Sequence, residues 1–302
     1  MRFRRLGRTG LHVSEIGFGS LEIGRDWGVV PTDRSKPQET ESIQLLEAAV
    51  TLGVNFVDTA MAYVKSEERI GRAISSGRVP RDSFYLATKA GERFDEMTGS
   101  QYDYSYTGIT RSIMESLERL QVDRVAGLQL HTAPLEVVRM RDAIRALHHL
   151  RRAGRCVFVG ASFSNEQACV EAIKSGDYDT IQITYNLLER SGAERLLALA
   201  QDADVGVIVK LPLAKGMLSA KVELLSPEEQ AKVAPYRFLE REGQTLSQAA
   251  LRFVLSHPAV STTIPGTKRV EHLRENVAVT DGQGLPPADL VRIRAIPDIS
   301  PK

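Results

Sequence analysis

Cysteine is scarce in this chain of 302 residues, which contains two, Cys156 and Cys169. Cys156 lies in a strand-like run and Cys169 in a helical one, so we interpret both as reduced, buried thiols. The sequence therefore excludes the disulfide framework of a small secreted domain. It favours a cytoplasmic protein.

Long apolar runs and an excess of charge are also missing. No apolar run approaches the roughly 18 residues of a membrane-spanning helix, and residues 1–7 lack the apolar core of a signal peptide. The net charge of +1 creates no strong field that would attract nucleic acid or a membrane surface. We therefore expect neither partner, whereas the oligomeric state is not indicated. The 42% hydrophobic and 25% charged residues are ordinary for a protein with a buried core.

Strand and helix patterns alternate along the chain. Residues 3–13 predict a β-hairpin whose turn is Leu6-Gly7-Arg8-Thr9-Gly10. Eight strand-like apolar runs follow the hairpin, at residues 16–19, 54–58, 84–88, 126–131, 156–160, 180–184, 205–209 and 261–264. Helical periodicity of 3.6 appears at residues 39–52, 67–75, 107–120, 135–153, 166–175, 193–202, 246–256 and 270–277, and again at 285–296.

This alternation predicts the α/β class, as one (β/α)8 TIM barrel over residues 1–302 with an N-terminal β-hairpin. A doubly wound sheet is the alternative, but it usually carries a G-x-G-x-x-G turn after its first strand. Residues 17–22 lack the third glycine. Long loops are expected after strands one and seven, at residues 24–38 and 212–243, and such loops usually bind or cover a ligand.

Four polar residues lie at or near the ends of neighbouring predicted strands. Asp58, Lys89 and His131 close the second, third and fourth runs, and Tyr63 follows the second by five residues. Barrel enzymes place their chemistry at these strand ends. A lysine there needs a partner such as Asp58, and an ammonium beside a phenol lowers the pKa of that phenol. We therefore expect Tyr63 to donate a proton near neutral pH, with His131 bonding a substrate oxygen.

Several further segments occur in a specific order and spacing. They are Arg5–Leu11, Gly53–Ala60, Ala87–Lys89, Ser116–Leu120 leading to His131, Gln182–Arg190, Pro212–Ala214, and Ile264–Gly266 with Glu275 and Asn276. Together with the four polar residues, this order resembles the aldo-keto reductases over nearly the whole chain. The resemblance implies an NADP(H)-dependent oxidoreductase that reduces an aldehyde or ketone, or oxidises the matching alcohol. It implies a small-molecule substrate and no metal.

The resemblance also implies a role for each of the four residues. In the family, the position of Tyr63 is the general acid and that of Lys89 tunes it. The position of Asp58 pairs with the lysine, and that of His131 orients and polarises the carbonyl. The nicotinamide carries the hydride, while the protein supplies geometry and charge stabilisation.

Cofactor contacts are implied by the same resemblance. Ser20 corresponds to a residue near the nicotinamide ribose, Ser162 and Gln182 to carboxamide contacts, Pro212, Leu213 and Lys221 to pyrophosphate contacts, and Gly266, Lys268, His272, Glu275 and Asn276 to the adenosine end. Lys268 and Arg269 precede the last barrel helix, where cations and a helix N-terminus suit the 2′-phosphate of NADPH.

Two positions depart from the family pattern. Phe163 stands where the family usually has asparagine, and Lys210 stands where an aromatic residue commonly stacks on the nicotinamide. We expect Lys210 at the mouth beside the cofactor. There it either pairs with the cofactor phosphates or an anionic substrate group, or turns to a carboxylate on the long loop.

Two alternative functions stay open. One is a nucleotide-sensing binding subunit, because potassium-channel β subunits resemble this family. The other is a step on a deoxysugar or another dedicated metabolite, because one fold hosts many functions. The aromatic residues Trp27, Phe94, Tyr102 and Tyr104 predict either a substrate wall or a packing cluster.

Overall fold

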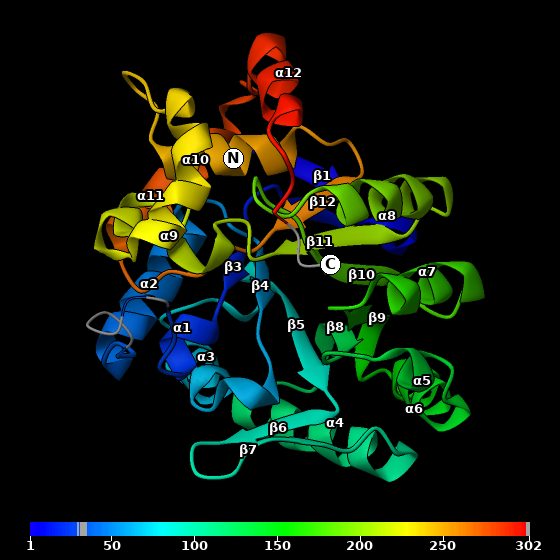
Figure 1. The fold of residues 1–302 in the computed structure, drawn as a ribbon. Helices are drawn as coiled ribbons and strands as arrows, with labels where there is room; N and C mark the ends of the chain where they lie inside the picture. The colour runs from blue at the N-terminus through cyan, green and yellow to red at the C-terminus, as the bar shows by residue number, and fades with distance from the viewer. Residues whose placement is uncertain (29, 31–34, 300–302) are drawn as a thin grey trace.

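Eight parallel strands form the centre of the molecule, with helices packed around them (Figure 1). The computed structural model describes residues 1–28, 30 and 35–299, so residues 29 and 31–34 of the first predicted loop lie outside the described residues. Along the sheet, the strands are β3 (Phe18–Gly19), β4 (Phe56–Asp58), β5 (Tyr85–Ala90), β8 (Val125–Leu130), β9 (Cys156–Ser162), β10 (Thr180–Thr184), β11 (Gly206–Lys210) and β12 (Val260–Thr263).

The sheet closes on itself where β12 meets the segment that leads into β3. The amide of Gly17 donates to the Thr263 carbonyl at 2.8 Å, and the amide of Thr263 donates to the Glu15 carbonyl at 3.0 Å. Isolated parallel bridges at Ile16–Thr263 and Gly19–Gly266 extend the contact. The predicted barrel is therefore confirmed, and its closure brings all the carboxyl ends of the strands to one mouth.

The other end of the barrel is covered by the predicted hairpin, β1 (Phe3–Arg5) and β2 (His12–Ser14). Its turn presses Gly7 against the start of β11, where a Cβ on Gly7 would lie 2.1 Å from the Gly206 nitrogen. We call the apolar cluster above this turn the barrel floor; it contains Leu6, Val13, Phe56, Ala87, Ala126, Phe158 and Ile208, and Ile264 packs on it from the cleft side. The side chains of the floor are apolar and buried.

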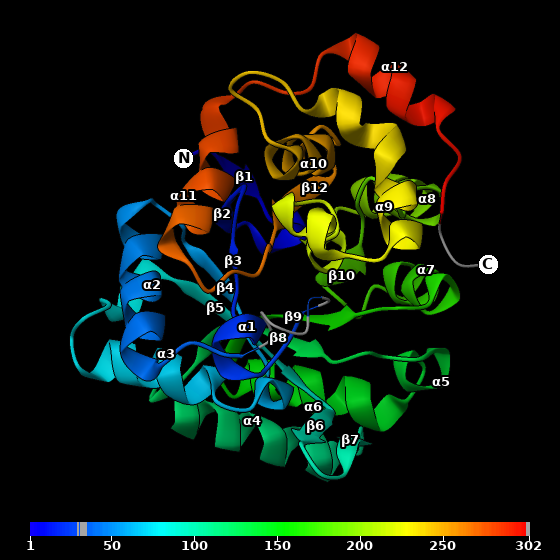
Figure 2. The same ribbon diagram turned by 60° about the vertical axis from the view of Figure 1, so that its left-hand side comes forward.

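Helices cover the outside of the barrel. They are α2 (Glu39–Thr51), α3 (Ser66–Ser75), α4 (Tyr106–Leu120), α5 (Leu135–Val138), α6 (Arg141–Arg152), α7 (Glu166–Ser175), α8 (Ser191–Asp202), α10 (Leu246–Leu255) and α11 (Val270–Ala278), with α12 (Pro287–Ala295) near the end. Figure 2 shows α11 beside α2, which completes the ring. No described helix is long and apolar enough to cross a membrane.

One predicted helix is two. The structure divides residues 135–153 into α5 and α6, because Met140 has an extended ψ of 110° and begins α6 as its N-cap. Helix α5 packs on α7, whereas α6 packs on α4 and β9. Two sets of neighbours require two helix axes, which a single periodic pattern cannot reveal.

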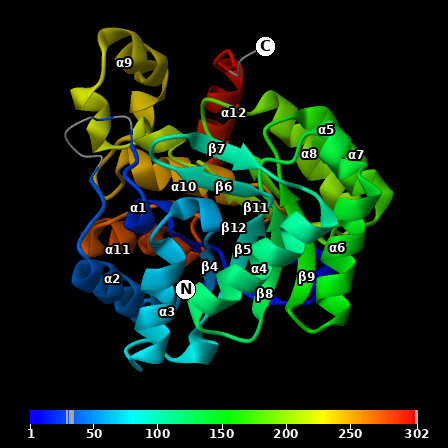
Figure 3. The ribbon, with the colours of Figure 1, turned by 90° about the horizontal axis from the view of Figure 1, so that it is seen from below.

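A second hairpin, absent from the sequence prediction, follows β5. Strands β6 (Glu92–Asp95) and β7 (Gly99–Tyr102) pair antiparallel and pack beside the turn Met61–Tyr63 (Figure 3). Gly91 begins the hairpin with a φ of +96°, and a Cβ there would lie 2.4 Å from the ring of Tyr104. Glycine permits both the positive φ and the close approach. The hairpin therefore sits next to Tyr63.

The two long connections predicted after strands one and seven are present. The first begins with the short helix α1 (Leu21–Gly24). The second contains several 3₁₀ turns and α9 (Pro227–Val233), whose Ser226 and Glu229 form a capping box. This second connection is thus built of short helical pieces.

Candidate active site

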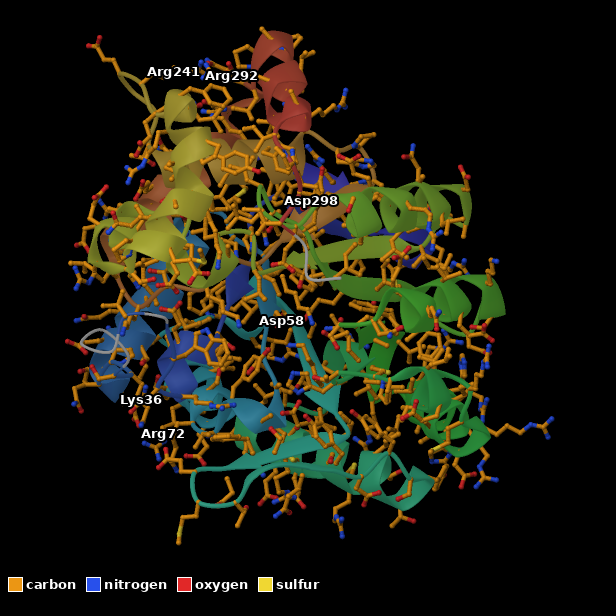
Figure 4. The ribbon with its side chains drawn as sticks, in the orientation of Figure 1. Lys36, Asp58, Arg72, Arg241, Arg292 and Asp298 are labelled. Carbon is orange, nitrogen blue, oxygen red and sulfur yellow. The ribbon has the colours of Figure 1, made fainter. Side chains whose placement is uncertain are left out.

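Three of the four predicted polar residues form one hydrogen-bonded chain at the mouth. Asp58 ends β4, Lys89 lies near the end of β5, and Tyr63 closes a 3₁₀ turn after β4. The Lys89 Nζ donates to Asp58 Oδ2 at 2.5 Å and to the Tyr63 hydroxyl at 3.0 Å. Lys89 is 0% exposed, so its charge depends on this partner. Figure 4 shows Asp58 near the centre of the molecule in that view.

The carboxylate of Asp58 is held by further donors. Its Oδ1 accepts from Gln182 Nε2 at 2.7 Å and from Gln129 Nε2 at 3.3 Å. The hydroxyl of Ser20 donates to the Asp58 carbonyl at 2.8 Å and is itself buried. The aspartate is thus fixed from several neighbouring strands, and it fixes Lys89 in turn.

The pKa values of this chain of groups differ from the expectation in one respect. Burial raises the pKa of Tyr63, and the nearby Lys89 ammonium offsets this rise only in part. The expected lowering of the phenol pKa is therefore not what the structure gives, because desolvation of the phenolate outweighs the attraction of one ammonium that is already paired. Tyr63 is held as a neutral phenol, the form that can donate a proton.

Lys89 stays charged for a related reason. Burial by itself would lower the pKa of its ammonium, but attraction to Asp58 and then to Tyr63 raises the pKa by more. The ammonium consequently remains next to the phenol oxygen at neutral pH. It can stabilise negative charge that develops there.

His131 directly follows β8 and faces Tyr63, with the two rings edge to face at a centroid distance of 5.7 Å. Its Nδ1 lies 3.1 Å from Glu92 Oε2, although the pair does not form a hydrogen bond. Burial lowers the pKa of His131 well below its usual range, with Lys89, Lys210 and Arg25 adding to the effect. The imidazole is therefore neutral at neutral pH.

A cleft of about 940 Å³ extends from these groups across the mouth. Eleven of the twelve residues predicted to contact a cofactor line it: Ser20, Gln182, Lys210, Pro212, Leu213, Lys221, Gly266, Lys268, His272, Glu275 and Asn276. The exception is Ser162, which is buried at the end of β9. The structure thus brings the predicted set together along one surface.

The two departures from the family pattern, Phe163 and Lys210, meet around Ser162. Phe163 is the next residue in the chain, and Lys210 bonds the Ser162 hydroxyl. Phe163 is buried in the core. Lys210 ends β11, lines the cleft and donates to the Ser162 hydroxyl at 3.1 Å. Burial lowers the pKa of Lys210 to about 8, with repulsion from Lys89 as the next cause. Among the described residues it forms no ion pair, so the expected alternative of a loop carboxylate partner is not found.

Cations gather at the far end of the cleft. Lys268 and Arg269 precede α11, and the Lys268 Nζ donates to the Ser35 carbonyl at 2.9 Å. Thr245 donates to Glu275 Oε1 at 2.5 Å beside them. A helix N-terminus with two cations and nearby carboxylate and amide groups can hold the phosphate and ribose of a nucleotide.

Residues 15–298 match the model of the aldo/keto reductase family. This chain belongs to that family. L-galactose dehydrogenase of Arabidopsis thaliana is 31% identical over 94% of this chain and 90% of its own length. A putative voltage-gated potassium channel subunit beta of Schizosaccharomyces pombe is 31% identical over 99% and 94%. The holo structure of an aldo-keto reductase of Bacillus halodurans has a TM-score of 0.84 and 28% identity, covering 97% of this chain and 95% of the other. Aldo-keto reductases are oxidoreductases that typically use NAD(P)H.

The aromatic residues predicted as a substrate wall divide into two groups. Trp27 lines the cleft of this aldo-keto reductase. Tyr104 stacks on Tyr102 and donates to the His131 carbonyl at 2.5 Å, so it supports the histidine segment. The ring of Phe94 lies under the guanidinium of Arg25. Of the predicted substrate wall, Trp27 therefore lines the cleft, whereas Tyr104 supports the segment that carries His131.

Sequence reasoning missed Arg25, Glu92 and Gln129. Glu92 and Gln129 are polar residues at buried positions, on β6 and inside β8. Gln129 carried a usable signal, because it is the polar residue in the apolar run Val125–Leu130. Glu92 and Arg25 gave no such signal, because Glu92 is placed by the unpredicted β6/β7 hairpin and Arg25 by the unpredicted helix α1. Within the described residues, no group of three or more His, Cys, Asp or Glu side chains is placed to hold a metal.

Proposed function

We propose that this aldo-keto reductase catalyses NADP(H)-dependent reduction of an aldehyde or ketone to an alcohol, or the reverse, with Tyr63 as general acid. The observation that carries the proposal is the buried chain Asp58–Lys89–Tyr63, with contacts of 2.5 and 3.0 Å. Such a chain has one evident chemical use, which is to deliver a proton to an oxygen that becomes negative.

The residues along the cleft fit a nicotinamide dinucleotide. Amide and hydroxyl groups near Asp58, such as Gln182 and Ser20, and the cations Lys268 and Arg269 line one continuous cleft of about 940 Å³. Gln182 would contact the nicotinamide end, Lys221 the pyrophosphate, and Lys268 with Arg269 the adenosine phosphate. The bound cofactor would supply the hydride.

The chain's own residues then handle charge and protons. His131 bonds the substrate oxygen and orients it beside Tyr63. As negative charge develops on that oxygen, the Tyr63 hydroxyl donates its proton. The Lys89 ammonium stabilises the phenolate that results, while Asp58 and its amide donors keep the ammonium in place. This pre-arranged field lowers the barrier without reorganisation of water.

A turnover assay tests the proposal. Oxidation of NADPH would be followed with a panel of aldehydes, ketoses and cyclic ketones, and oxidation of L-galactose and other sugars with NADP⁺ and NAD⁺ in parallel. We expect turnover with at least one carbonyl compound in the panel. Tight NADPH binding without any turnover would favour instead the nucleotide-sensing role, as in a channel subunit.

A further inference from the structure

Two cations at the mouth form no direct ion pair among the described residues. They are Arg25, which follows α1, and Lys210, which ends β11. The carboxylates that act on them do so from beyond ion-pair distance: Glu92 and Glu96 act on Arg25, and Asp58, Glu189 and Glu92 act on Lys210. Asp58 is itself paired with Lys89, and Glu92 accepts from Ser100 at 2.6 Å and from Thr132 at 3.2 Å. Each of the two cations therefore lacks a directly bonded carboxylate, and this leaves its N–H donors available to an anionic ligand.

The backbone that carries Arg25 packs against the turn that contains Tyr63. A Cβ on Gly24 would lie 2.1 Å from the Tyr63 carbonyl oxygen, and the amide of Lys65 donates to the Gly24 carbonyl at 3.2 Å. Glycine is needed at position 24 because the two segments approach so closely. The next residue, Arg25, is thereby fixed next to the residue expected to donate the proton.

The guanidinium of Arg25 crosses to the β6/β7 hairpin. Its Cζ lies 3.2 Å from the centroid of the Phe94 ring and 5.8 Å from that of Trp27. Phe94 is two residues after Glu92 on β6, so both side chains leave the strand on the same face as His131. Arg25 is thus held by Phe94 near the proposed catalytic groups, close enough for its charge to lower the pKa of His131.

Stacking leaves the hydrogen-bonding edge of a guanidinium available. An arginine that lies flat on aromatic rings keeps its five N–H donors at its rim, in a fork that matches a carboxylate or phosphate. Lys210 faces the same mouth from β11, with a neutral hydroxyl as its described hydrogen-bond partner. A partly desolvated cation of this kind is stabilised by a counter-charge.

We propose that the substrate carries an anionic group, a carboxylate or a phosphate, which binds to Arg25 and Lys210 while its carbonyl lies at Tyr63 and His131. The proposal rests on the proposed function and names its substrate class. The cofactor phosphates are not the expected partners, because Lys221, Lys268 and Arg269 line the part of the cleft that would hold them.

The test uses pairs of aldehydes that differ in charge. The first pair is 4-carboxybenzaldehyde and its neutral methyl ester, and the second is glyceraldehyde 3-phosphate and glyceraldehyde. For the wild-type enzyme we expect the anionic member of at least one pair to have the higher kcat/KM, by about tenfold or more. The two pairs distinguish a carboxylate from a phosphate substrate.

Substitution of each cation tests whether the preference for anionic substrates depends on Arg25 and Lys210. Arg25→Met and Lys210→Met should each lower the anionic-to-neutral ratio of kcat/KM by about tenfold, mainly through KM. Arg292→Met is the matched control, since Arg292 also stacks on an aromatic ring, with its Cζ 3.7 Å from the Phe238 centroid. Arg292 lies at the upper edge of the molecule, away from Asp58 (Figure 4), and its loss should leave the ratio unchanged.

Other results would overturn the proposal. An equal kcat/KM for both members of each pair, or an unchanged ratio in Arg25→Met, contradicts an anion site at Arg25. A weaker NADPH Kd in Lys210→Met, with the ratio unchanged, would assign Lys210 to the cofactor. If no aldehyde is turned over, the proposed function fails separately. The anion site is then judged by calorimetry of 4-(hydroxymethyl)benzoate and its methyl ester with the NADP⁺ complex, where equal affinities count against it.

Discussion

The two ends of this barrel are built from opposite kinds of contact. At the floor, the hairpin and the strand interiors meet in a buried apolar cluster around Phe158 and Leu6. At the mouth, the same strands end in Asp58, Lys89 and Lys210, and the cleft opens beside them. The floor stabilises the fold by burial, whereas the mouth holds charges that burial makes costly. In this protein, stability and chemistry are therefore expected to respond to different substitutions.

Among these substitutions, Tyr63→Phe should have the largest effect, and that effect should be confined to kcat. Removing the phenol hydroxyl removes the proposed proton donor while the ring is retained. We expect kcat to fall by roughly 10²- to 10⁴-fold, with little change in NADPH Kd or in Tm. Steady-state kinetics and a fluorescence titration of NADPH would measure both. Retention of more than about a tenth of wild-type kcat would contradict the assignment.

Phe158→Ala should give the complementary effect at the floor. Phe158 is 1% exposed, and Gly127 makes room for it, since a Cβ there would lie 2.3 Å from the ring. We expect a loss of about 3 to 5 kcal/mol in the free energy of unfolding. Denaturant titration would measure the loss, and kcat per folded molecule should be retained. A fall in kcat as large as the one in Tyr63→Phe would show that the two ends are coupled.

Lys210→Met should raise stability at neutral pH, the reverse of the floor substitution. The folded-state pKa of Lys210 is about 8, below the ordinary value of 10.5. A lowered lysine pKa costs stability below pH 8, and the cost is relieved as the pH rises from about 8 to 10.5, because the unfolded chain then binds more protons. We expect a gain on the order of 1 to 3 kcal/mol near pH 7.

The pH dependence supplies the check on this gain. Denaturant titrations of wild type and Lys210→Met at pH 7, 9 and 10.5 should converge as the pH rises. A constant difference across that range would mean that packing of the new methionine, and not the lysine charge, accounts for the gain.

Lys268→Ala should give the smallest effect, confined to cofactor choice. If the Lys268 ammonium binds the 2′-phosphate, its loss should lower the NADPH-to-NADH ratio of kcat/KM by about tenfold, which corresponds to about 1.4 kcal/mol. High salt should reduce the wild-type preference in the same direction. An unchanged ratio would remove Lys268 from the phosphate site and favour a structural role through contacts such as the one with Ser35.

Part of the site could be predicted because it follows from local pattern and topology. Parallel strands that close into a barrel must end at one mouth, so polar residues after successive apolar runs are brought together whatever the details of packing. This is why Asp58, Lys89 and Tyr63 were found from sequence. Their roles in catalysis, and the assignment of residues 1–302 to one domain, stay predictions.

The sequence by itself determined the alternation of the eight barrel strands with helices, the N-terminal hairpin and the residues at the strand ends, because these depend on short-range periodicity. The tertiary structure alone decided the β6/β7 hairpin, the division of α5 from α6, and the meeting of Arg25 with Phe94. It also decided that the pKa of Tyr63 is raised. Each of these features depends on residues that are distant in the chain, because burial and charge act through space and not along the sequence.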